Sequence, residues 1–145
     1  MFTTLYTTSK NILNNTQSLS LLLARLTLAY GFYEPAMKKW GDIDAIAGWF
    51  GSMGIPFPTL NAYIAATTEL LGVVLLTLGL LTRIISIPLI IIMIVAIATV
   101  HGIHGFSSGN NGFEIPLYYI LFLMTFASYG AGKFSLDYLI FGDEQ

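Results

Sequence analysis

Four long apolar stretches follow one another along this chain, and each approaches the roughly 20 residues that a helix needs to cross the hydrocarbon layer of a membrane. They lie at residues 18–37, 59–81, 84–103 and 115–132. The third is the most apolar, because it holds no charged residue from Ile84 to Val100. This pattern predicts four membrane-spanning helices. Few residues separate the second stretch from the third, so these two are expected to be antiparallel neighbours.

The long connection between the first two stretches has a pattern of its own. Ile43, Ile46, Ala47 and Phe50 fall on one side of a helix over residues 43–51. This spacing predicts a short amphipathic helix lying in the membrane interface. Such a helix could cover a site as a lid or could be an ordinary interfacial connection, and the sequence favours neither.

Composition agrees with a membrane protein. The chain has 145 residues, of which 55% are hydrophobic and only 10% are charged, and its mean hydropathy is +0.74. A soluble core of this size could not bury so much apolar surface. We therefore predict a single domain over residues 1–145, folded as an all-α integral membrane protein with an antiparallel four-helix bundle.

Charge and cysteine content narrow the functional classes. The net charge is −2 and the longest basic cluster is the pair Lys38 and Lys39, which argues against nucleic acid as a partner. The chain has no cysteine, which excludes disulfide exchange, iron–sulfur ligation and thiolate metal sites within it. Redox chemistry would then depend on a cofactor or on a partner protein.

Positive charges outside the apolar stretches predict the orientation. In a four-span arrangement, Lys10, Arg83 and Lys133 fall on the side of the two termini, whereas Lys38 and Lys39 fall on the other side. Cytoplasmic segments carry the excess of basic residues in membrane proteins. The three-to-two bias therefore favours cytoplasmic termini.

Two ionisable residues, Arg25 and Glu69, lie deep within the predicted spans. At a rise of about 1.5 Å per residue, they fall within about one helical turn of each other in depth. Because a charge at membrane depth is costly unless it is paired, we predict a buried structural ion pair between them. Ala65, Ala66 and Gly72 lie near Glu69 and would let a neighbouring helix approach closely.

A second polar group gathers at the end of the spans opposite the termini. Its members are Glu34, Lys38, His101, His104 and Glu114. Anchoring in the interface is one explanation. A metal site is a second, but glycines loosen the turn around the histidines and no cysteine or clustered methionine supports them, so no metal site is predicted. The third is a pocket that handles protons beside a flat apolar ligand such as a quinone, because histidine titrates near neutrality.

The pocket explanation assigns roles to individual residues. Glu69, His101 and Glu114 would be catalytic. Lys38, Tyr63 and Tyr118 would contact the bound cofactor, although aromatic residues near a membrane interface are also common as simple belt residues. His101 is favoured over His104, which comes later in a glycine-flanked turn.

Several motifs occur together between about residue 20 and residue 138. They read LLLARLTLAYGFYEPAMKKW, WFGSMGIPFPTLNAYIAATTELLGVVLLTLGLLTR, MIVAIATVHGIHGF, NGFEIPLYYILFL and GAGKFSLD. Together they resemble the DoxX family of small bacterial membrane proteins with four helices. The family pattern falls on Arg25, Lys38, Glu69, Arg83, His101, Glu114 and Asp137. Many relatives have His-Gly before the lysine matched by Lys38, whereas this chain has FYEPAMK, so Glu34 would have to replace that histidine.

The resemblance implies a place in the bacterial cytoplasmic membrane and a redox setting. Members are similar to DoxD, a membrane subunit associated with thiosulfate:quinone oxidoreductase. We therefore expect a multi-pass membrane subunit that binds a quinone or another small apolar redox partner. The ligand would occupy the pocket formed by the second polar group, in the outer half of the membrane. It would couple that ligand to a partner oxidoreductase, as part of a complex or a homo-oligomer. Whether the chain is itself an enzyme stays open.

Two other functional classes compete with this expectation. One is a non-catalytic membrane anchor or assembly subunit, whose polar residues only hold helices together. The other is a small solute or metal-ion carrier. The carrier is disfavoured because the sequence shows neither inverted repeats nor helices broken at the membrane midplane.

Overall fold

The computed structural model of the protein describes residues 2–142, apart from the side chains of residues 2–5, 8, 11, 12 and 15. Over that range all regular structure is helical and no strand is formed, which confirms the predicted all-α class. The α-helices are α1 (Phe2–Gly41), α2 (Ile43–Ser52), α3 (Pro58–Leu78), α4 (Thr82–Ala96), α5 (Glu114–Tyr129) and α6 (Leu136–Phe141). The π-helix η1 (Ile97–His101) and the 3₁₀ helix η2 (Gly102–His104) continue α4, and the 3₁₀ helix η3 (Ser108–Asn110) lies in the following loop.

Most of these helices match the predicted ones. The predicted spans 59–81, 84–103 and 115–132 correspond to α3, to α4 with its continuation, and to α5, and the amphipathic segment 43–51 corresponds to α2. Two helices of the described chain, Pro58–Leu78 and Thr82–His104, are long and apolar enough to cross a membrane, whereas α5 is shorter. The bundle of four spans stays a prediction.

Two features of the helices were not predicted. α1 begins at Phe2 and not at residue 18, because no glycine or proline interrupts the polar segment that precedes the apolar stretch. α6 has only six residues, too few to show a helical period in the sequence. Its start is capped by Ser135, whose hydroxyl accepts the N–H of Tyr138 at 3.2 Å.

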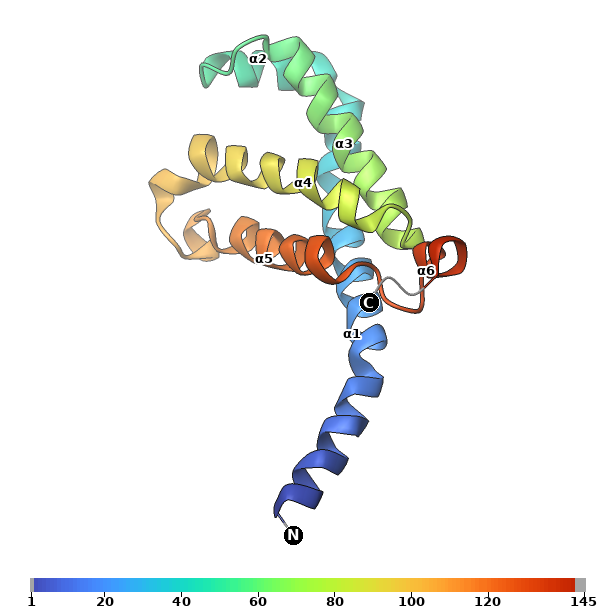
Figure 1. Ribbon diagram of the computed structural model, residues 1–145. Helices are drawn as coiled ribbons and strands as arrows, with labels where there is room; N and C mark the ends of the chain where they lie inside the picture. Colours follow the sequence, from blue (N-terminus) through green and yellow to red (C-terminus); the bar gives the residue numbers. More distant parts are fainter. Residues whose placement is uncertain (1, 143–145) are drawn as a thin grey trace.

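The helices pack as two pairs. α1 lies along α3 and α4 lies along α5, and the two pairs diverge from the region of the α3–α4 turn, with α2 over the far end of α3 (Figure 1). A cluster of buried apolar side chains joins the pairs where they meet. It includes Leu28, Phe32, Leu76, Leu89, Leu123 and Phe126. Toward the other end the divergence of the pairs leaves space between them.

Arg25 closes the end of the molecule at which α3 turns into α4. This arginine is fully buried, and its guanidinium donates to the carbonyl oxygens of Leu76 at 2.8 Å and Phe134 at 2.6 Å. Gly79 ends α3 in the left-handed region, at φ 65°, and its missing side chain makes room for the guanidinium. Arg25 therefore ties α1, α3 and the segment before α6 together.

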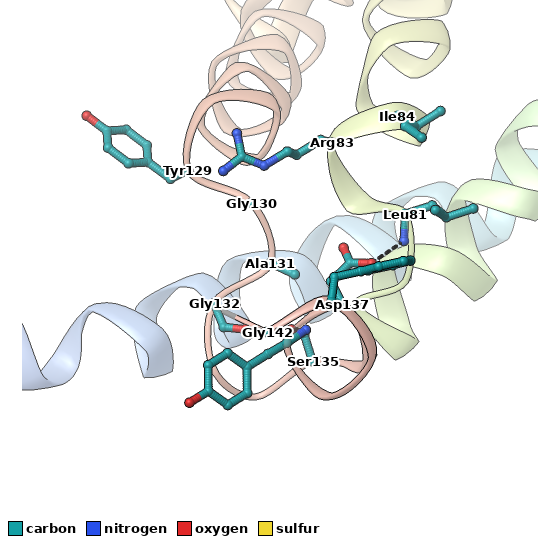
Figure 2. A pocket seen from close by; sticks show the side chains of 12 residues that line it. Leu81, Arg83, Ile84, Tyr129, Gly130, Ala131, Gly132, Ser135, Asp137 and Gly142 are labelled. Atoms are coloured by element: carbon teal, nitrogen blue, oxygen red, sulfur yellow. Dashed lines mark hydrogen bonds between the residues drawn. The ribbon is translucent and has the colours of Figure 1, made fainter. Parts of the chain in front are cut away.

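Asp137 holds the same turn from the other side. Its carboxylate accepts the backbone N–H groups of Leu81 at 2.7 Å and Thr82 at 3.0 Å, at the start of α4 (Figure 2). The first N–H groups of a helix have no partner within the helix, and a carboxylate is favoured beside them. Asp137, which the family resemblance singled out, is thus a cap for α4.

Candidate functional site

A large cavity lies where the two helix pairs diverge. Its volume is about 800 Å³, and residues of α1, α2, α3, α4 and α5 line it. Most of the lining is apolar, including Phe32, Ile64, Ile91, Met93, Val95 and Ile115. Pockets of roughly 300–1,000 Å³ with apolar walls and few polar groups are the usual binding sites for small molecules. We call this space the α1–α5 cavity.

Lys39 and Glu69 form the charged part of the α1–α5 cavity. The Lys39 ammonium donates to both carboxylate oxygens of Glu69, at 2.8 and 3.0 Å. The Glu69 side chain is 2% exposed and the Lys39 side chain 15%. A buried carboxylate satisfied in this way is stable only while its cation stays in place. The pair therefore presents compact polar chemistry to an otherwise apolar space.

The position of Lys39 follows from the geometry of α1. Arg25, Phe32 and Lys39 are spaced seven residues apart, so they fall on the face of α1 that packs against α3. Side chains on a helix point back toward its N-terminus, which directs Lys39 from near the end of α1 into the molecule. On α3, the buried Ala62, Ala65 and neighbouring small residues let α1 approach Glu69 closely.

His101 lies on the far wall of the α1–α5 cavity, at the end of η1. It is half-buried, and its Nδ1 lies 2.8 Å from the carbonyl oxygen of Asn111. A carbonyl oxygen can only accept, so Nδ1 carries the hydrogen, and in the neutral ring Nε2 is left with a free lone pair. The π-helical segment adds a residue to the turn that carries this histidine, a feature found often at functional sites.

Tyr119 adds a hydroxyl group to the same cavity. Its ring packs edge-on against Phe32, with the ring centroids 5.2 Å apart, and it also lines the α1–α5 cavity. The hydroxyl lies directly over Gly31 of α1, at a place where a Cβ atom would collide with it. Gly31 is therefore what allows α5 to bring this tyrosine so close to α1.

The predicted ion pair between Arg25 and Glu69 is wrong. Arg25 donates to backbone carbonyls and Glu69 pairs with Lys39. The depth estimate placed the outer end of the first span at residue 37, whereas α1 continues to Gly41. Four more residues move Arg25 inward by about 6 Å relative to α3, at about 1.5 Å per residue. Both residues are nonetheless buried, as their cost at membrane depth led us to expect.

Lys38, predicted to bind the cofactor, lies outside the α1–α5 cavity. It pairs with Glu34 at 2.6 Å on the exposed side of α1, with both side chains more than 70% exposed. Glu34 and Lys38 are spaced i, i+4, a spacing that favours an ion pair on the surface of a helix. The seven-residue spacing from Arg25 and Phe32 was the signal that could have identified Lys39 instead.

The structure brings together only part of the predicted polar group. Glu69 and His101 line one cavity, whereas His104 is exposed outside it. Tyr63, predicted to contact the cofactor, instead packs edge-on against Trp40, with ring centroids 6.0 Å apart and outside the cavity lining. The catalytic roles of Glu69 and His101 stay predictions.

Glu114 and Tyr118 form a separate cluster with the preceding loop. The Glu114 carboxylate accepts the backbone N–H of Ser108 at 2.9 Å and the hydroxyl of Tyr118 at 3.0 Å. These hydrogen bonds, that of Ser108 first, hold the pKa of Glu114 below the usual glutamate range. Neither Glu114 nor Tyr118 lines the α1–α5 cavity, so the structure favours a loop-fixing role for Glu114. Its predicted catalytic role has no support in this geometry.

Metal coordination finds no geometric basis in residues 2–142. Within this part of the chain, no three or more histidine, cysteine, aspartate or glutamate side chains come together as ligands would. The site is therefore best described as an apolar cavity with a buried Lys–Glu pair, a half-buried histidine and a tyrosine.

Comparison with known proteins identifies the family of this chain. The DoxX family model matches residues 20–102. An uncharacterized protein of Haemophilus influenzae is 35% identical over 129 residues, covering 83% of each chain. An uncharacterized membrane protein of Mycobacterium tuberculosis is 30% identical over 129 residues, covering 81% of this chain and 79% of that one.

A third relative has a name that refers to a reaction. It is CatD of Bacillus subtilis, named as a proposed oxidoreductase, which is 32% identical over 75 residues, covering 52% of this chain and 54% of that one. No solved structure matches the chain.

Proposed function

This chain belongs to the DoxX family of membrane proteins, and we propose that it binds a quinone or a similar small apolar redox carrier in the α1–α5 cavity. It would serve as the membrane subunit of a redox system and place the carrier within reach of a partner oxidoreductase. The observation that carries this proposal is the buried Lys39–Glu69 pair in the wall of an apolar cavity.

The residues of the cavity suit such a ligand. A quinone has a flat apolar ring with carbonyl oxygens, and its redox chemistry takes up two electrons and two protons. Apolar walls favour the ring by excluding water. Lys39 can donate a hydrogen bond to a carbonyl oxygen, and the Tyr119 hydroxyl is a second donor in the lining of the cavity.

This chain's own residues would bind the carrier and manage protons. Lys39 and Glu69 hold each other in place, so a ligand oxygen meets a preorganised donor. His101, with Nδ1 fixed by Asn111, keeps Nε2 for proton exchange at the cavity wall. Electrons would come from the partner oxidoreductase. The name of the CatD relative, which refers to an oxidoreductase, supports a redox setting.

We infer four spans in the cytoplasmic membrane of a bacterium, with both termini in the cytoplasm. α3 and the helix Thr82–His104 have the length and composition of spans, and the apolar part of α1 and α5 would supply the other two. The α1–α5 cavity would then open in the outer half of the bilayer, where a quinone diffuses.

The test measures quinone affinity of the full chain in lipid nanodiscs. Glu69→Gln removes the carboxylate that positions Lys39. The control Glu34→Gln removes the carboxylate of the exposed Glu34–Lys38 pair on α1. A hydrogen bond to a charged group contributes about 1.5–3 kcal/mol, so we expect Glu69→Gln to weaken ubiquinone binding at least about ten-fold. Glu34→Gln should bind as the unmodified protein does.

Folding must be checked in the same samples, by helical content and thermal unfolding. Equal quinone affinity in a folded Glu69→Gln variant would refute the binding role. If the unmodified protein binds no quinone but copurifies with a protein subunit in fixed ratio, the chain is an anchor or assembly subunit.

A further inference from the structure

A second cavity lies at the opposite end of the molecule, where the α3–α4 turn faces the connection between α5 and α6 (Figure 2). Its volume is about 250 Å³, several times the roughly 30 Å³ that one water molecule occupies in the liquid. The lining includes Arg83, Ile84, Tyr129, Gly130, Ser135 and Tyr138. We call it the Arg83 cavity.

Arg83 uses only part of its hydrogen-bonding capacity within residues 2–142. Its Nη1 donates to the carbonyl oxygens of Ala127 at 3.2 Å and Ser128 at 2.7 Å, at the end of α5. Within residues 2–142, no hydrogen bond is formed by Nε or Nη2, and no carboxylate oxygen lies within 4 Å of this guanidinium. The unused N–H groups form the fork that matches phosphate and carboxylate oxygens.

The neighbouring backbone leaves this fork open. Figure 2 shows the guanidinium pointing toward the chain at Gly130. A Cβ atom at Gly130 would lie 3.3 Å from Nε and 3.5 Å from Nη2, so a side chain here would cover the free donors. Gly130 also has a φ of 76°, which favours glycine.

Among residues 2–142, the charged groups near this cavity include Arg25, Arg83 and Asp137. Both oxygens of Asp137 accept N–H groups at the start of α4, and Arg25 interacts with that carboxylate electrostatically. Arg25 and Asp137 thus offset each other, and within residues 2–142 Arg83 is left as a half-buried cation without an acidic partner. Such a cation in a membrane protein calls for an anionic partner.

Exposed aromatic and aliphatic side chains around the cavity mark the level of the lipid headgroups. Tyr129, Leu139, Ile140 and Phe141 are all more than half exposed, and the last three lie on the short helix α6. Tyrosine is enriched where the hydrocarbon layer meets water, and apolar faces of short helices insert there. The Arg83 cavity therefore opens where phospholipid phosphates lie.

We propose that the Arg83 cavity binds the phosphate group of an anionic membrane phospholipid. Nε and Nη2 of Arg83 donate to two phosphate oxygens, and the acyl chains leave along the exposed side of α4 at Ile84. This site is independent of the quinone proposal.

The experiment is a titration of the detergent-purified full chain with phosphatidylglycerol, followed by native mass spectrometry, with phosphatidylcholine as the comparison lipid. One basic residue contributes about 1 kcal/mol at an anionic lipid surface, which corresponds to about a five-fold change in affinity. We expect Arg83→Gln to bind phosphatidylglycerol about five-fold more weakly than the unmodified protein does. The control is Lys133→Gln, which removes the same charge from an exposed position at the same end. This variant should bind phosphatidylglycerol as tightly as the unmodified protein does.

Arg83→Gln also removes the bonds to α5 and could unfold the protein. Tyr138→Glu avoids this, because it places a carboxylate in the cavity wall and leaves Arg83 intact, with Tyr138→Gln as its control. The proposal predicts weaker phosphatidylglycerol binding in Tyr138→Glu alone. Equal losses in Arg83→Gln and Lys133→Gln, or equal binding of both lipids by the unmodified protein, would overturn it. So would inorganic phosphate that binds as tightly as the lipid, since the site would then serve a free anion.

Discussion

Two adjacent lysines at the end of α1 show that a shift of one residue along a helix decides whether a side chain is exposed or buried. Lys38 lies on the exposed face beside Glu34, and Lys39 lies inside against Glu69. Consecutive residues of a helix point about 100° apart, so the same side chain meets water in one position and a buried carboxylate in the next. The two pairs have the same chemistry, and only the inner one is protected from solvent.

This contrast gives a prediction at the residue scale. Lys39→Met leaves Glu69 as a buried carboxylate without its cation, and breaking a buried pair in this way costs about 3–5 kcal/mol. The double variant Lys39→Met, Glu69→Leu removes both charges and should regain most of that loss, because apolar replacements of a buried pair are often neutral. Thermal unfolding in detergent measures each variant.

Lys38→Met is the matched control, because it makes the same substitution one residue earlier, on an exposed pair. It should unfold at the temperature of the unmodified protein. A double variant as unstable as Lys39→Met would mean that Lys39 contributes by packing and not by charge.

Residue-scale prediction from sequence succeeded for burial and failed for pairing. The cost of a charge at membrane depth correctly indicated that Arg25 and Glu69 are buried. Their partners depend on how far α1 slides along α3, and the apolar pattern did not define the end of α1 to within a helical turn. A shift of one turn was enough to give Arg25 carbonyl partners and to leave Glu69 to Lys39.

At the scale of elements, contacts at the helix ends fix how α1, α3, α4 and α6 are arranged. The motif GLLTR was predicted only as a tight connection, yet it contains the glycine that ends α3 and the backbone N–H groups that Asp137 caps. Arg25 reaches the same place from α1. Charged residues far apart in the sequence thus meet at one turn, which explains why the family pattern includes them although they lie outside the α1–α5 cavity.

Gly79→Ala tests this turn. Gly79 has a φ of 65°, and an added Cβ would overlap the Arg25 guanidinium and the Cβ of Ser135. The guanidinium is held by two hydrogen bonds and cannot move freely. Backbone strain of about 1 kcal/mol and overpacking of about 1–3 kcal/mol add up, so we expect a loss of about 3 kcal/mol in unfolding free energy.

Gly54→Ala separates the two causes. Gly54 has a φ of 75°, but an added Cβ would meet nothing within 4 Å. Only the backbone strain of about 1 kcal/mol should remain. Denaturant unfolding compares the two variants, and equal losses would show that space for Arg25 is unimportant at Gly79.

For the whole molecule, the sequence was a good guide to helix content and a poor one to arrangement. Long apolar runs located α3, α4 and α5, because their apolar composition is a local property. The divergence of the pairs α1–α3 and α4–α5, and hence the α1–α5 cavity, depends on contacts between distant segments such as Tyr119 over Gly31 (Figure 1). No local pattern records such contacts.

The number of spans is the last property to test, and the absence of cysteine makes the test clean. Single cysteines are introduced at exposed positions as Ser9→Cys, Ser52→Cys, Ser107→Cys and Lys133→Cys, and intact cells are treated with a membrane-impermeant maleimide. With four spans and cytoplasmic termini, Ser52→Cys and Ser107→Cys are labelled in intact cells, and the other two only after lysis.

Other patterns of labelling have definite meanings. If only α3 and the helix Thr82–His104 cross the membrane, all four positions lie on one side and label alike. That result would refute the four-span bundle, although Glu69, near the middle of α3, would still lie within the hydrocarbon layer. If instead Ser9→Cys and Lys133→Cys are labelled in intact cells and the other two only after lysis, the chain has four spans but the orientation predicted from the charge bias is wrong. The Arg83 cavity would then face the outer leaflet, where its lipid partner must be sought.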